Sequence, residues 1–126
     1  MRRMALAVLL LVVSGACREP VATTAAYGHG EPSGDAERGR QLFTRYGCNV
    51  CHLVPGVTGA QGMLGPSLDG VASRGLISLG TIENTPANLA RFIQSPGALN
   101  PKSTMPPMGI TPAEATDIAA YLGTLR

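Results

Sequence analysis

The sequence predicts a small all-α domain, with three short helices and long loops wrapped around a bound group. Three apolar, periodic segments carry helix-start signals, near residues 35–46, 85–95 and 111–125. Glycine and proline interrupt the chain between them. About ninety residues with so few helices form a poor core. A domain of this size often needs an additional stabilising element, such as a disulfide, a metal or a bound group. A compact Cys-x-x-Cys-His motif follows the first segment directly.

The chain of 126 residues is long enough for one domain and an extension, and residues 1–17 predict an export signal. An arginine pair precedes an apolar run at residues 4–13, which is too short to span a bilayer. Small residues then lead to Cys17, as in the lipobox of bacterial lipoproteins. Ser14 stands where lipoboxes favour leucine, so ordinary signal cleavage with a free thiol is the alternative. We expect lipidation, because a lone thiol is a liability in an oxidising compartment.

Residues 18–34 are rich in alanine, threonine, proline and glycine and show no apolar period, which predicts a flexible linker. His29 lies there between two glycines and is expected to be solvated. Of the ten basic residues two precede this linker, so eight basic and eight acidic residues remain from Arg18 onward. This balance argues against nucleic acid as a partner.

The first predicted helix opens the domain, which we place at residues 35–126. Asp35 caps the helix, and Gly47 ends it after about Tyr46. Gly39 and Phe43 lie on one helical face. A glycine inside a helix costs up to about 1 kcal/mol relative to alanine, which indicates close contact with another helix.

The next stretch, Cys48-Asn49-Val50-Cys51-His52, is the attachment signature for a c-type haem. The two thiols form thioethers with the two vinyl groups of the porphyrin, and His52 binds the iron from the proximal side. A thioredoxin-like pair would need a βαβ pattern that is missing here. A zinc site needs four ligands, which this chain supplies poorly, and a disulfide would leave His52 unexplained. The motif predicts one covalent haem c.

Loops and the two remaining helices complete the domain. A loop is predicted at residues 53–65, and a rigid turn follows at residues 65–68. Residues 71–74 are weakly helical, and glycines interrupt the segment at residues 75–83. The second helix starts at Thr85-Pro86 and stops at Pro96-Gly97; the third starts with a capping box of Thr111 and Glu114 around Pro112. The apolar face of the second helix is formed by Leu89, Phe92 and Ile93. That of the third helix is formed by Ala115, Ile118, Ala119, Leu122 and Leu125. We expect Leu68, Ile93 and Leu122 to pack against the haem.

Three methionines beyond the export signal are candidates for the sixth iron ligand, since many electron carriers hold iron between histidine and methionine. Met63 lies eleven residues past His52, in the loop that leaves the proximal side. Met105 and Met108 lie in a proline-stiffened loop between the second and third helices. Spacing alone ranks Met105 above Met108 and leaves the choice open.

From residue 35 to 126 the chain resembles a class I cytochrome c domain. It is similar to the haem-bearing C-terminal domain of bacterial cytochrome c oxidase subunit II. The copper-binding domain and transmembrane hairpin of that subunit have no counterpart here, nor does the chain contain tryptophan. The matching stretches are Cys48 to His52, Gly65-Pro66-Ser67-Leu68, Ser73-Arg74, residues 84–89, Met105-Pro106-Pro107 and residues 117–122.

The resemblance implies a cytochrome c-like fold and a set of haem contacts. Met105 becomes the distal ligand opposite His52. The backbone carbonyl of Pro66 accepts a hydrogen bond from Nδ1 of His52, which fixes the tautomer. Arg74 and Ser103 contact the haem propionates.

The resemblance also implies that the first and last helices cross, with Gly39 and Phe43 meeting Ile118 and Tyr121. Its function would be that of a monohaem electron carrier, not an enzyme, on the extracytoplasmic side of a bacterial membrane. Partners would be redox proteins such as a respiratory oxidase or reductase, reached from a lipid anchor at Cys17. The alternatives are a haem subunit of a larger oxidase or dehydrogenase, and a haem enzyme or gas sensor with an open sixth position.

Overall fold

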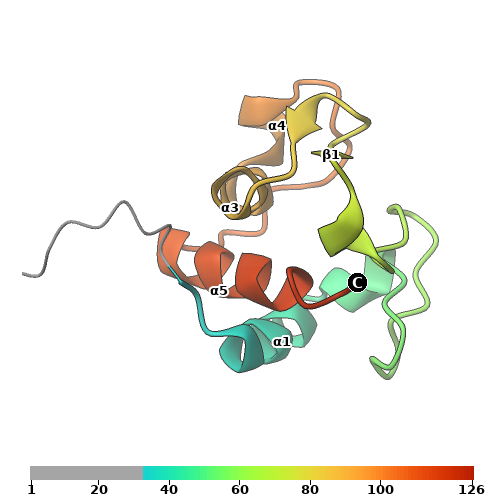
Figure 1. Cartoon of the computed structure of the whole chain (residues 1–126). Coiled ribbons are helices and arrows are strands. Elements are labelled where there is room, and N and C mark those ends of the chain that lie inside the picture. The colour runs from blue at the N-terminus through green and yellow to red at the C-terminus, as the bar shows by residue number, and fades with distance from the viewer. Residues whose placement is uncertain (1–32) are drawn as a thin grey trace, which may run out of the picture.

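The computed structural model describes residues 33–126, so the predictions for the export signal, for Cys17 and for most of the linker lie outside the described residues. The described part is mostly helical, as predicted. Helix α5 lies at the centre, with α1 against one side and α3 against the other (Figure 1). The elements in chain order are α1 (Ala36–Arg45), α2 (Cys48–Cys51), the 3₁₀ turn η1 (Val71–Ser73), β1 (Leu76–Ile77), β2 (Ile82–Glu83), α3 (Pro86–Gln94), α4 (Pro96–Leu99) and α5 (Pro112–Leu122).

The predicted crossing of the first and last helices is confirmed. A Cβ atom at Gly39 would overlap the backbone of Asp117 and come within 2.9 Å of Cβ of Tyr121. The rings of Phe43 and Tyr121 meet edge-on with centroids 5.7 Å apart, a favoured aromatic geometry. Ile118 is buried beside them. The interior glycine of α1 is therefore what allows α5 to approach so closely.

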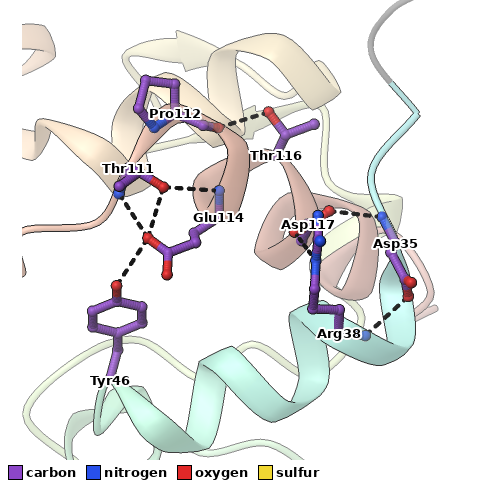
Figure 2. A network of polar contacts seen from close by, with 8 residues as sticks. All are labelled: Asp35, Arg38, Tyr46, Thr111, Pro112, Glu114, Thr116 and Asp117. Carbon is purple, nitrogen blue, oxygen red and sulfur yellow. Dashed lines mark hydrogen bonds and ion pairs between the residues drawn. The ribbon is translucent and has the colours of Figure 1, made fainter.

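Asp117 clamps the start of α1 to α5, a role that the sequence did not reveal. Its carboxylate is buried and accepts two hydrogen bonds from the other helix (Figure 2). Oδ1 accepts from the backbone N–H of Asp35 at 2.8 Å, and Oδ2 accepts from Nε of Arg38 at 2.5 Å. The Arg38 hydrogen bond is the largest factor that lowers the pKa of Asp117. A buried charge is tolerated because it is paired and hydrogen-bonded.

The three predicted helix caps are confirmed. Asp35 accepts from the N–H of Arg38 at 2.9 Å and Thr85 from the N–H of Asn88 at 3.2 Å. Thr111 and Glu114 form the reciprocal capping box at the start of α5. Side-chain oxygens at these positions satisfy N–H groups that have no partner inside the helix.

The predicted stop of the second helix at Pro96-Gly97 is confirmed, but the sequence did not predict the further turn that begins there. Helix α3 ends at Gln94, but Pro96 begins the further turn α4. Proline lacks the N–H that the first helical position leaves unpaired, and its fixed φ suits that position. Pro96 therefore both prevents α3 from continuing and starts the next turn.

A two-stranded hairpin replaces the irregular segment predicted before α3. Strands β1 and β2 are antiparallel, with Leu76 opposite Glu83 and Ile77 opposite Ile82. The turn between them takes Ser78 through a positive φ of 52°. Strands of two residues have no readable alternation, so the sequence pattern missed them.

The apolar core lies where α1, α3 and α5 meet. The expected haem neighbours Ile93 and Leu122 are buried in it, and Leu68 is partly buried against it. Within residues 33–126, none of the helices has the length and apolar character needed to cross a membrane.

Replacing Gly39 with alanine tests the helix crossing. The added Cβ would overlap the Asp117 backbone, so Gly39→Ala is expected to lower the free energy of unfolding of the holoprotein by about 1–3 kcal/mol. Chemical denaturation measures it. Gly97→Ala in α4 is the matched control, because a Cβ there meets nothing within 4 Å. Equal stability of the two variants would contradict the crossing geometry.

Candidate functional site

The Cys-x-x-Cys-His motif is built on a single helical turn. Gly47, with a φ of 69°, ends α1 and redirects the chain into α2. Cys48 and Cys51 are three residues apart on this turn, so they lie on one face. Both are half-buried and free of a disulfide. Burial raises the pKa of the Cys48 thiol to about 11, which does not suit the low-pKa thiolate of a thioredoxin-like centre.

His52 follows α2 in extended conformation and is held by the next turn of the chain. Its Nδ1 lies 2.8 Å from the carbonyl oxygen of Pro66. A carbonyl oxygen can only accept, so Nδ1 carries the proton and Nε2 is left with its lone pair. This is the arrangement in which a histidine is oriented as a metal ligand through Nε2. The structure thus contains the His52–Pro66 contact that the family resemblance implied.

Two glycines allow the chain to lie directly against the motif. A Cβ at Gly65 would be 2.5 Å from Cε1 of His52, and a Cβ at Gly62 would overlap the backbone of Val50 and Cys51. The N–H of Gly65 also donates to the carbonyl of Cys51 at 2.8 Å. From the sequence, Gly62 was expected only within a loop and Gly65 at the start of a rigid turn. The signal it missed is that a glycine is required where another segment approaches closely.

Arg74 supports the turn that carries Pro66. Its Nη2 donates to the carbonyls of Ser67 and Asp69, each at 2.7 Å. The backbone carbonyl of Arg74 in turn accepts from Nδ2 of Asn84 at 2.8 Å. A guanidinium has five donors, so these two bonds use only part of its capacity.

The segment between α4 and α5, residues 100–110, is called here the distal loop. The hydroxyl of Ser103 accepts from the N–H of Met105 at 3.2 Å. Met105 is half-buried, whereas Met108 is 36% exposed and Met63 is 93% exposed. Within residues 33–126, no hydrogen bond joins this loop to the pair His52 and Pro66.

The anchors of the distal loop are polar at one end and apolar at the other. Asn100 is buried, and its Nδ2 donates to the hydroxyl of Ser78 at 2.9 Å. At the other end Ile110 is buried in the core. Both ends of the loop are therefore fixed to the body of the domain.

These residues fit one haem c. Two thiols share one face of a turn, and the adjacent imidazole has its Nε2 free. The distal loop offers thioethers as soft neutral ligands. Within residues 33–126, no three histidine, cysteine or acidic side chains gather as a metal-ion ligand set.

Comparison with known proteins gives the family. The model of the cytochrome c family matches residues 36–126. A search of curated proteins finds no match. Among solved structures, the cytochrome c2 of Paracoccus denitrificans is similar in fold, with a TM-score of 0.55 and 24% sequence identity. The match covers 71% of this chain and 93% of the cytochrome c2 chain.

The family match extends over α1 to α5 and includes the whole motif. Members of the family bind one covalent haem c through a Cys-x-x-Cys-His motif, and the cysteines here have that spacing. The chain therefore belongs to the cytochrome c family and binds one haem c through Cys48 and Cys51.

Proposed function

We propose that this chain is a monohaem electron carrier that passes single electrons between respiratory redox partners. The observation that carries the proposal is the fixed orientation of His52, whose Nδ1 is bound 2.8 Å from the Pro66 carbonyl. Membership of the cytochrome c family supports an electron-transfer protein rather than an enzyme. The haem would supply the one-electron chemistry, and residues of the chain would keep the iron ligands in place.

His52 and Met105 are the residues that would hold the haem iron. A histidine held on one face by Gly65 and at Nδ1 by Pro66 has little freedom to leave the iron. In the distal loop, the Ser103 hydroxyl accepts a hydrogen bond from the backbone N–H of Met105. Pro106 follows Met105 directly and limits its backbone to extended conformations. Ligands that stay bound in both oxidation states keep the reorganisation energy low.

Leu68, Arg74 and Ser103 are the proposed remaining contacts of the haem. Leu68 is partly buried against the core and offers an apolar wall. Arg74 has guanidinium donors beyond the two carbonyl bonds to Ser67 and Asp69, and a propionate is a suitable acceptor for them.

The proposed setting is the extracytoplasmic side of a bacterial membrane, with Cys17 as a lipid anchor. The apolar run and small residues before Cys17 support export and lipidation. The resemblance to the haem module of oxidase subunit II supports a respiratory oxidase or reductase as partner. A role as a subunit of such a complex is the alternative, and copurification with larger subunits would favour it.

Substitution of each distal methionine tests the ligand assignment. Met105→Ala is expected to lower the midpoint reduction potential by tens of millivolts or more, a small part of the ~0.8 V range that axial ligands cover. Met108→Ala is the matched control and is expected to leave the potential close to that of the wild type. Potentiometric titration of the holoproteins measures both. If only Met108→Ala lowers the reduction potential, Met108 is the iron ligand and Met105 is not.

Metabolic labelling of the full chain tests the anchor. Labelled palmitate is expected in the wild-type protein, and the protein is expected in the membrane fraction. Cys17→Ser should lose both the label and the membrane association, because it removes the thiol that accepts the lipid. Unlabelled wild-type protein in the soluble periplasmic fraction would show ordinary signal cleavage instead.

A further inference from the structure

One carboxylate oxygen joins two segments that border the haem site. Oε2 of Glu114 accepts from the hydroxyl of Tyr46 at 2.9 Å (Figure 2). The same oxygen accepts from the hydroxyl of Thr111 at 2.7 Å and from its N–H at 3.0 Å. The capping box of α5 is therefore extended by a tyrosine from another helix.

The positions of Tyr46 and Thr111 in the chain show which segments these hydrogen bonds connect. Tyr46 is the C-cap of α1 and stands two residues before Cys48. Thr111 is the N-cap of α5 and directly follows the distal loop. The Tyr46–Glu114 bond thus connects the start of the haem-attachment turn with the end of the loop that carries Met105. The two bonded residues are 68 positions apart in the sequence.

The distal loop, which carries Met105, is held at both of its ends. At its start, Asn100 is buried and bonded to Ser78. At its end, Thr111 is bound to Glu114, which Tyr46 holds from the side of α1. Tyr46 is partly buried against the core, so its ring has a fixed support. Without the Tyr46 hydroxyl, the capping box would keep its hydrogen bonds within α5 but would lose its hydrogen bond to α1.

We propose that Tyr46 and Glu114 are positioning residues that hold the distal loop closed on the haem. They act through Thr111, and within residues 33–126 neither side chain is hydrogen-bonded to His52 or Met105. The proposal rests on the proposed ligation by Met105. It predicts that breaking the Tyr46–Glu114 bond raises the population of loop-open protein, in which an external ligand can replace the methionine.

Imidazole binding to the ferric holoprotein measures this population. The apparent affinity of an external ligand is proportional to the fraction of protein that is competent to bind it. Tyr46→Phe removes only the hydroxyl. Imidazole is expected to bind this variant about three- to tenfold more tightly than the wild type. The lost hydrogen bond is to a charged carboxylate, and such bonds are strong enough to account for a change of this size. The visible spectrum reports binding.

Thr116→Val is the matched control. It also removes a hydroxyl from a bond near the start of α5, because Oγ1 of Thr116 donates to the Pro112 carbonyl at 2.9 Å (Figure 2). That bond stays within α5, so imidazole affinity is expected to remain within about twofold of the wild type. In a Glu114→Gln background, Tyr46→Phe should add little further change, since the charged acceptor is already gone.

The outcomes separate this proposal from the proposed function. If Met105→Ala binds imidazole more tightly than the wild type but Tyr46→Phe does not, the positioning role is overturned and the ligand assignment stands. Equal tightening in Tyr46→Phe and Thr116→Val would also overturn it, because any loosening of α5 would then suffice. If Met105→Ala binds imidazole like the wild type, the ligand assignment fails, and this proposal fails with it.

Discussion

The hydrogen bond between His52 and the Pro66 carbonyl is the interaction on which the rest of the site depends. It fixes the imidazole tautomer and leaves the lone pair of Nε2 available to a metal ion. The bond requires residues 62–66 to lie against the motif, and Gly62 and Gly65 are the positions where a side chain would prevent this. Arg74 then stabilises the same turn through two backbone carbonyls. Hydrogen bonds and close backbone contacts therefore hold a segment that has no regular secondary structure.

Helix α1 leads into the haem-attachment turn, and α1 itself packs against α5. Two carboxylates three residues apart on α5 bind α1 near both of its ends (Figure 2). Asp117 binds the first turn of α1 through Asp35 and Arg38, and Glu114 binds Tyr46 just before the motif. Between them, Gly39 allows close contact of the two backbones. The haem-attachment turn therefore starts from a helix end whose position is set by polar contacts as well as by packing.

Local signals in the sequence predicted the main helices, whereas the crossing of the first and last helices was expected from family resemblance. Asp35, Thr85 and Thr111 mark helix starts because capping involves residues only three positions apart. The hairpin of β1 and β2 and the one-turn helices α2 and α4 are too short to show a period. The bonds of Asp117 and Tyr46 span 82 and 68 positions, and no sequence pattern encodes such pairs. The His52–Pro66 contact was expected from family resemblance alone.

We propose that protein ligands occupy both sides of the iron, as an electron carrier requires. A visible spectrum of the reduced wild-type holoprotein before and after addition of carbon monoxide tests it most directly. An unchanged low-spin spectrum is the predicted result, since His52 and a distal methionine would leave no open position. A clear shift to a carbonyl complex would contradict the account and show an open or easily displaced sixth ligand.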